Sequence, residues 1–149
     1  MPAGCATTTA AAAAGGDVTG GLTVEMYVAQ EGESYARYRV ENDGVLRFAG
    51  GREAQDRKFT WSGPMTGQEI ADLRALIAEH GWLDSDPPST GLPEGLTCEI
   101  RLRQAGRRRS FTVRGDNAEV AAVRKLLATA ARRRNEEFLR RLPIPGERK

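Results

Sequence analysis

Apolar and polar residues alternate along four stretches in the first half of the chain, which is the pattern of half-buried β-strands. The predicted strands cover residues 22–28, 35–41, 45–49 and 58–62. Between the second and third strands, the run Asn42-Asp43-Gly44 favours a tight hairpin because these residue types tolerate positive φ. The side chains predicted to face the core are Leu22, Val24, Met26, Val28, Ala36, Tyr38, Val40, Leu46, Phe48, Phe59 and Trp61.

The apolar spacing changes to that of an amphipathic helix after the fourth strand. Thr66 and Glu69 stand at the spacing of a capping box, which predicts the start of the helix. Gly81 is expected to end it in a left-handed conformation, with Trp82 packing back on the helix. The apolar stripe of this helix comprises Ile70, Leu73, Leu76 and Ile77.

A proline-rich loop at 84–95, a second hairpin and a second helix complete the predicted order. The second helix is expected to begin at Asp116, with Glu119 at the capping-box position. Its apolar stripe fails after Ala131, so its last turns are expected to project beyond the core or to fray. The inward positions predicted for the hairpin and this helix are Leu96, Cys98, Ile100, Leu102, Phe111, Val113, Val120, Val123, Leu127, Ala130 and Ala131.

The elements follow the order β-β-β-β-α-β-β-α, and hairpins link most of the strands. The sequence therefore predicts an α+β domain with a largely antiparallel sheet and both helices on one face. At 149 residues the chain fits one domain. Residues 21–142 are assigned to that domain, 1–20 to a disordered tail or tether rich in Ala, Thr and Gly, and 143–149 to a flexible tail.

Charge is distributed unevenly along the sequence, although the formal net charge is only +2. Residues 17–99 include 7 basic and 15 acidic side chains, whereas residues 101–141 include 13 basic and 4 acidic ones. This polarity is typical of a surface for nucleic acid or an anionic membrane, or of two halves that neutralise each other. The candidate anion-binding patch comprises Arg101, Arg103, Arg107, Arg108, Arg109, Lys125, Arg132 and Arg133.

Catalytic and metal-binding patterns are missing from the sequence. A zinc site built from Cys and His lacks ligands, because His80 is the only histidine and the two cysteines form no CxxC pair. His80 is predicted to be structural at a helix end, and Cys98 to be an inert core residue. Asp84 and Asp86, with Glu94 nearby, could gather around calcium, but their loop lacks the ligand number and the glycine placement of an EF-hand. The sequence predicts a non-enzyme without a cofactor; a small hydrolase built on two carboxylates in a deep pocket is the enzymatic alternative.

The start of the chain contains a short motif with a chemical meaning. Ala3-Gly4-Cys5, followed by Thr, Ala and Gly residues, resembles the lipobox that ends a bacterial lipoprotein signal. Pro2 stands where such signals usually carry Leu, and the basic and apolar segments of a signal would lie upstream of Met1. The resemblance implies that Cys5 is a lipid attachment point followed by a tether. The alternative is a cytosolic protein with a disordered, Ala-rich start.

Residues 22–131 as a whole resemble small bacterial envelope domains of uncharacterised function, often found in predicted lipoproteins. The shared features are the Asp-Gly hairpin, the capped helix that ends at an aromatic residue, the proline-rich loop and a further hairpin and helix. The resemblance implies a fold and a compartment but no activity. We therefore expect a lipid-anchored envelope domain that binds a protein, an envelope polymer or an anionic membrane surface. The alternative is a cytosolic domain that binds nucleic acid through its basic hairpin and helix.

Overall fold

The computed structural model describes residues 18–30, 34–85, 95–115 and 117–142. Cys5, Asp86, Glu94 and Asp116, to which the sequence assigned or weighed roles, lie outside these ranges, as do most of the expected tether and the C-terminal tail. The elements are β1 (Thr23–Gln30), β2 (Ser34–Val40), β3 (Val45–Gly50), α1 (Gly51–Gln55), β4 (Trp61–Pro64), α2 (Gly67–His80), β5 (Leu96–Gln104), β6 (Arg107–Arg114) and α3 (Ala118–Arg140).

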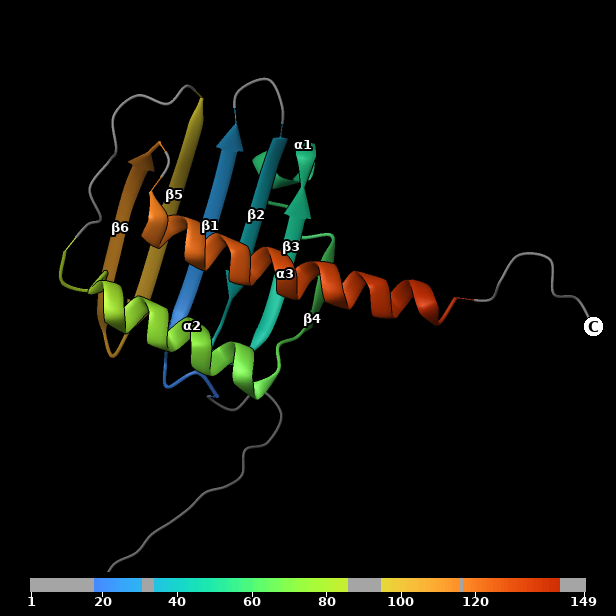
Figure 1. The fold of residues 1–149 in the computed structure, drawn as a ribbon, viewed down its shortest axis with the longest axis horizontal. Helices are drawn as coiled ribbons and strands as arrows, with labels where there is room; N and C mark the ends of the chain where they lie inside the picture. Colours follow the sequence, from blue (N-terminus) through green and yellow to red (C-terminus); the bar gives the residue numbers. More distant parts are fainter. Residues whose placement is uncertain (1–17, 31–33, 86–94, 116, 143–149) are drawn as a thin grey trace, which may run out of the picture.

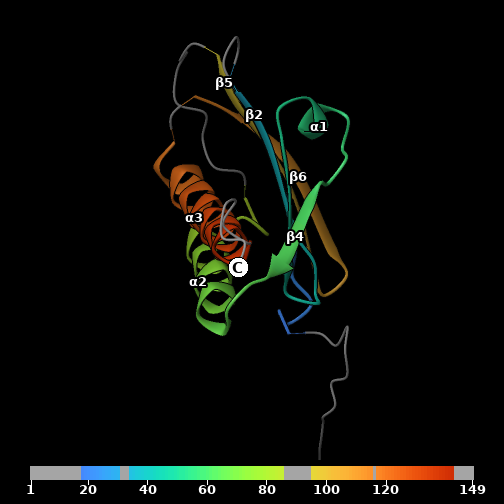
Figure 2. The ribbon, with the colours of Figure 1, turned by 90° about the vertical axis from the view of Figure 1, so that its right-hand side faces the viewer.

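The six strands form one sheet in the order β4-β3-β2-β1-β5-β6, and every neighbouring pair is antiparallel (Figure 1). The two long helices, α2 and α3, cover one face of this sheet, and the short α1 lies on the other face (Figure 2). The predicted α+β class, with an antiparallel sheet and both long helices on one face, is confirmed.

The core lies between the sheet and the two long helices. Alternation had assigned the inward side chains correctly on most strands, because one face of each strand must be buried there. Trp82 is fully buried, and its Nε1 donates to Glu119 Oε2 at 3.1 Å, which links the end of α2 to α3. The predicted inward positions that are buried include Leu22, Val24, Met26, Val28, Tyr38, Val40, Leu46, Ile70, Leu73, Ile77, Cys98, Ile100, Leu102, Phe111, Val113, Val120, Val123, Leu127, Ala130 and Ala131.

The expected boundaries of α2 are confirmed. Thr66 Oγ1 accepts a hydrogen bond from the Glu69 N–H at 3.1 Å, and Glu69 Oε1 accepts one from the Thr66 N–H at 2.8 Å. Gly81 ends the helix with φ of 65°, and the Trp82 N–H donates to Ile77 O. The capping box therefore sets the start of α2 and the left-handed glycine sets its end, and both signals can be recognised in the sequence.

Three local expectations were wrong. The charged stretch between the predicted strands 45–49 and 58–62 was expected to be a loop, but it forms α1 with Ala54 buried. The fourth strand is β4, Trp61–Pro64, rather than 58–62, so Phe59 precedes the strand and lies outside the core cluster. Helix α3 is capped by Asn117, whose Oδ1 accepts from two backbone N–H groups, at 2.9 and 3.1 Å. Asp and Asn are equally good N-caps, so the local sequence does not choose between neighbours.

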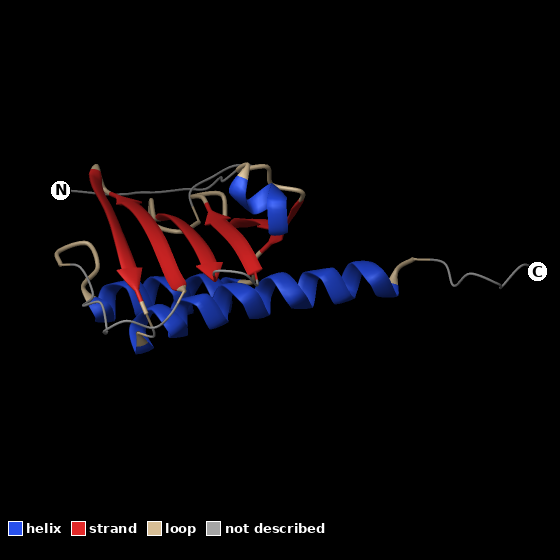
Figure 3. Ribbon diagram, turned by 90° about the horizontal axis from the view of Figure 1, so that it is seen from above, coloured by secondary structure: helices blue, strands red, loops and turns tan. Residues whose placement is uncertain are grey.

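Helix α3 continues to Arg140 without a break. Its C-terminal turns extend past β4, the edge strand of the sheet (Figures 1 and 3). Of the two outcomes expected for these turns, projection beyond the core is the one observed. Among the described residues, no helix has both the length and the apolar composition to cross a bilayer.

Candidate anion-binding site

The sheet face opposite α2 and α3 carries most of the polar strand side chains, since successive residues of a strand point to opposite faces. On β5, Arg101 and Arg103 point to this uncovered face, whereas Ile100 and Leu102 are buried on the other. On β6, Arg108 stands directly opposite Arg103. These three arginines of the β5–β6 hairpin therefore lie on one side of the sheet.

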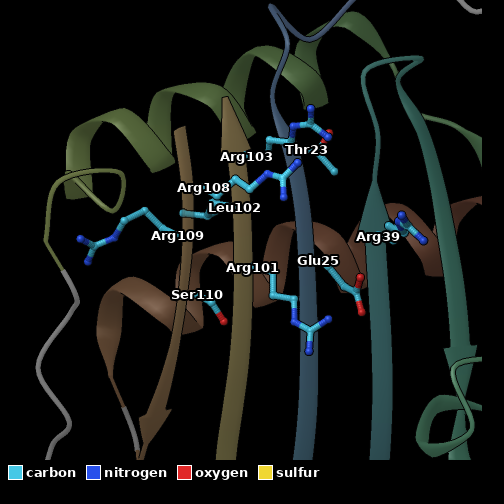
Figure 4. A pocket seen from close by; sticks show the side chains of 9 residues that line it. All are labelled: Thr23, Glu25, Arg39, Arg101, Leu102, Arg103, Arg108, Arg109 and Ser110. Atoms are coloured by element: carbon cyan, nitrogen blue, oxygen red, sulfur yellow. The ribbon is translucent and has the colours of Figure 1, made fainter. Parts of the chain in front are cut away.

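A shallow hollow of about 580 Å³ lies over these arginines (Figure 4). Arg101 reaches from β5 over β1, where Glu25 and Thr23 face the same side. The register arranges the site in two cross-strand rows, one through Glu25 and Arg101 and the other through Thr23 and Arg103. The residues that line the hollow are Thr23, Glu25, Arg39, Arg101, Leu102, Arg103, Arg108, Arg109 and Ser110.

The carboxylate that lines the hollow, that of Glu25, is already engaged. Arg37 Nη1 lies 2.6 Å from Glu25 Oε1, in a pair whose side chains are 5% and 16% exposed. Arg39 pairs with Glu41 at 3.0 Å. In the part of the chain that the structure describes, no ion pair engages Arg101, Arg103 or Arg108. The hollow therefore has an excess of positive charge on side chains that are free to bind an anion.

The facing pair Arg103 and Arg108 is unfavourable on its own. Like charges directly opposite each other on one face of an antiparallel pair destabilise the sheet. A bound anion between the two guanidinium groups would remove this repulsion, and the hydroxyls of Thr23 and Ser110 line the same hollow as additional donors. The arrangement is suited to phosphate or carboxylate groups.

The structure divides the patch expected from the sequence. Arg107 and Arg109 lie on the face of α2 and α3: Arg107 Nη2 donates to Leu83 O at 2.7 Å and pairs with Asp84, and Arg109 Nη1 lies 3.4 Å from Asp84 O. Figure 4 shows Arg109 pointing away from the other arginines. These two residues fasten the hairpin to the end of α2.

The helical members of the expected patch also lie apart from the hollow. Lys125 and Arg132 belong to α3, on the other side of the sheet, and Arg133 pairs with Glu69 of α2. Joining the hairpin and the helix into one patch was therefore wrong, because the sheet separates them. Thr23, Arg39 and Ser110, which were not predicted, take the place of the helical residues in the site.

Two tyrosines add aromatic surface to the uncovered face. The rings of Tyr27 and Tyr35 are stacked with centroids 6.4 Å apart, and the Arg37 guanidinium lies 4.4 Å from the Tyr27 ring centre. Burial raises the pKa of the Tyr27 hydroxyl, and the charge of Arg37 lowers it by less. Tyr27 is thus in contact with Arg37 and Tyr35, and its ring is largely engaged within the protein.

The residues weighed for catalysis do not form a site. His80 is largely buried, with its ring 5.5 Å from that of Trp82 and its Nδ1 3.9 Å from Glu119 Oε1. Cys98 is buried in the core, where desolvation raises the pKa of its thiol. The described residues contain no group of three side chains suited to hold a metal ion. The hollow itself has a single carboxylate, Glu25, which is paired, so it does not supply the two acids that a hydrolase would need.

Comparisons with protein families and with curated proteins were made for the whole sequence. No protein-family model matches the sequence, and a search of curated proteins finds no match. The function is therefore argued from the chemistry of the hollow and of the N-terminal motif.

Proposed function

We propose that this protein is a non-enzymatic binding domain of a bacterial cell envelope, held by a lipid on Cys5, whose uncovered sheet face binds an anionic envelope polymer. The group formed by Arg101, Arg103 and Arg108 carries the proposal, because no ion pair within the described residues neutralises it. The three arginines line one hollow on adjacent strands, and a ligand that supplies negative charge would neutralise them together.

Arginine suits this role chemically. Its guanidinium is always charged and presents donors in a planar fork that matches a phosphate or a carboxylate. Arg103 and Arg108 face each other across the hairpin, so one anion can bind both. The anion would replace the repulsion between them with two charge-assisted contacts.

A polymer with repeated charges fits the spacing better than a single small anion. Arg101 and Arg103 are two residues apart on one strand, which separates their Cα atoms by about 6.5–7 Å. A flexible chain with charged groups a few bonds apart can therefore contact both rows of the site together. Each additional contact is then intramolecular and raises the overall affinity.

The uncovered face is less suited to nucleic acid, the alternative expected from the sequence. Surfaces that bind single strands combine basic grooves with aromatic rings on which bases stack. The aromatic ring nearest the arginine rows is Tyr27, and Arg37 and Tyr35 already contact it. The arginines would bind the phosphates of a nucleic acid, but its bases could not stack on the Tyr27 ring, because Arg37 and Tyr35 already contact that ring.

The N-terminal motif supports an envelope location. A lipidated Cys5 followed by a tether would hold the domain near the polymers of the envelope, where even weak binding is sustained by proximity. Membrane fractionation of the protein expressed from its own locus tests this part. We expect the wild-type protein with the membranes and the Cys5→Ser variant in the soluble fraction. Equal fractionation of the two would refute the anchor.

The binding face is tested with poly(glycerol phosphate) as the probe, in a titration repeated over a series of salt concentrations. We expect R103Q/R108Q to weaken binding at least about tenfold and to reduce the salt dependence, since two phosphate contacts are lost. The matched control K125Q/R132Q removes two charges from the helical side and should bind as the wild type does. Equal loss in both variants, or no binding at low salt, would refute this face as the site.

Two further probes identify the class of ligand. A single-stranded oligonucleotide of equal charge should bind more weakly than the polymer; tighter binding would replace the proposal with the nucleic-acid alternative. Vesicles with phosphatidylglycerol should compete poorly, because a hollow of about 580 Å³ receives single charged groups rather than a flat surface. Binding to vesicles alone would replace the polymer with the membrane surface.

A further inference from the structure

Helix α3 is longer than the sheet that it covers. Its 23 residues correspond to about 34 Å at 1.5 Å per residue. Six strands about 4.8 Å apart span only about 24 Å between the first and the last. Because α3 crosses the strands, its C-terminal end passes over the edge strand β4 and leaves the sheet (Figures 1 and 3). About 10 Å of helix, roughly two turns, therefore has no strand beneath it.

This overhang, residues 134–142, carries exposed apolar side chains. Phe138 is 56% exposed, Leu139 55% and Leu142 46%. They are three of the four exposed large apolar residues in the described part of the chain. Phe138 and Leu139 lie in the last turn of α3, and Leu142 lies just past the helix end, where its N–H donates to Leu139 O at 3.2 Å. Exposed apolar side chains gathered at one place mark an interaction surface, whereas scattered ones do not.

A groove of about 290 Å³ runs between the overhang and β4. Trp61 of the edge strand and Phe138 of the helix form part of its walls. Glu137 of α3 and Arg141, the C-cap residue of that helix, line it as well. Glu137 pairs with Arg134 at 3.0 Å and with Arg133 at 3.9 Å, whereas Arg141 has no ion pair with a described residue.

We infer that the overhang is a self-association surface, on which the α3 ends of two copies pack antiparallel about a two-fold axis near Leu139. In this arrangement Glu137 of each copy faces Arg141 of the other, and the contact occurs twice because a two-fold interface is self-complementary. The apolar side chains of the two overhangs then cover one another. A parallel arrangement would place Glu137 against Glu137 and Arg141 against Arg141, and is disfavoured.

The helix rather than the strand edge makes this contact. The edge strand β4 has only four residues and ends at Pro64, which has no N–H to donate to a new strand. Short, proline-bearing edge strands discourage the addition of another strand. Two helix ends bury less than the roughly 800 Å² per partner of a standard interface. We therefore expect a weak, reversible dimer.

Sedimentation velocity of the full 149-residue chain over a wide concentration range tests the inference, with a reductant present so that Cys5 cannot cross-link two copies. We expect a reversible monomer–dimer equilibrium in the wild type and monomer only in F138S/L142S. Circular dichroism of each variant confirms that it is folded. A wild type that stays monomeric at every concentration, or a dimer that F138S/L142S leaves intact, would overturn the inference.

Charge reversal tests the antiparallel geometry. E137R and R141E should each weaken the dimer at least about tenfold, and the double variant E137R/R141E should restore it. Arg140 is the matched control, because it lies two residues from Phe138, on the opposite side of the helix, and R140E should leave the dimer unchanged. A double variant as weak as the singles, or a loss in R140E equal to that in R141E, would refute the antiparallel pairing.

Discussion

Arg37 of β2 and Glu25 of β1 form an ion pair on the sheet face that α2 and α3 leave uncovered, with Nη1 2.6 Å from Oε1. Arg37 also donates from Nε to Ala54 O at 2.8 Å, so the same side chain holds α1 against the sheet. Its guanidinium lies 4.4 Å from the ring centre of Tyr27. One arginine therefore links two strands, a helix and an aromatic ring, immediately beside the hollow that Glu25 lines.

Removing the acid of this pair should destabilise the protein strongly. We expect Glu25→Gln to lower the free energy of unfolding by about 3 kcal/mol, because Arg37 would remain buried without its counter-charge. The control is Glu41→Gln, which removes the acid of the more exposed pairs with Arg39 and Arg47 and should cost less than about 1 kcal/mol. Urea denaturation measures both. Similar losses in the two variants would contradict the structural role of the buried pair.

A side chain added at Gly44 in the β2–β3 turn is predicted to destabilise the protein. Its φ is +74°, and a Cβ atom there would lie 2.6 Å from Val18 Cγ2 and 3.0 Å from Ile70 Cδ1. We expect Gly44→Ala to lower the free energy of unfolding by about 2 kcal/mol, from the left-handed backbone and the contact together. Gly67→Ala is the control: its Cβ would meet nothing within 4 Å, and it should be neutral or slightly stabilising. Thermal unfolding that ranks the two equally would contradict this reading.

Patterns within short segments of the sequence were sufficient to predict most of the long strands and helices. The strand alternation and the capping box of α2 are properties of short segments, and they survive because the tertiary structure agrees with them. Helix α1 and the position of β4 depend instead on distant contacts. Arg37 donates a hydrogen bond to Ala54 O, which holds α1 against the sheet. The Lys58 N–H donates to Glu53 O, so the residue expected to begin the fourth strand belongs instead to the turn that follows α1. No local pattern contains either contact.

The candidate site was only partly predictable for the same reason. Alternation counted back from Phe111 places Arg107 and Arg109 on the core side and Arg108 on the other, and this signal was present in the sequence. The contribution of Thr23 was not, because it depends on β1 lying next to β5, a pairing of strands far apart in the chain. Tight turns in the sequence predict that consecutive strands pair, but they do not predict that the β1–β4 strands and the β5–β6 hairpin join through β1 and β5.

Cys98 should be unreactive in the folded protein. Burial raises the pKa of its thiol above the usual value, and the nearby charge of Arg124 lowers it by less. The thiolate, which is the reactive form, is therefore disfavoured, and the side chain is closed to reagents. In a Cys5→Ser variant, we expect Ellman's reagent to label no thiol in the native state and one after denaturation. Rapid labelling of the native variant would show that the strand carrying Cys98 is open to solvent.

The carboxylate of Glu69 should make stability depend on pH in the acid range. Burial alone would raise its pKa, but hydrogen bonds from the Thr66 N–H and from Arg133, with the Arg133 charge, outweigh burial and lower the pKa below its usual value. A lowered folded-state pKa means that the unfolded chain takes up the proton first as pH falls. The stabilisation is therefore complete above the unfolded-state pKa and is lost as pH falls through the lower folded-state value.

Glu69→Gln isolates this contribution, since Asp43 also has a lowered pKa and gives a slope of the same sign. Near neutral pH the variant should be less stable than the wild type, because the capping-box acceptor is weakened and Arg133 loses the nearer of its two counter-charges. The difference should shrink as pH falls below the usual pKa of a glutamate and through the lower folded-state pKa, where the wild type also becomes neutral at this position. Urea denaturation at a series of pH values measures it. A difference that is constant with pH would mean that Glu69 contributes through packing alone and that its charge does not stabilise the junction between α2 and α3.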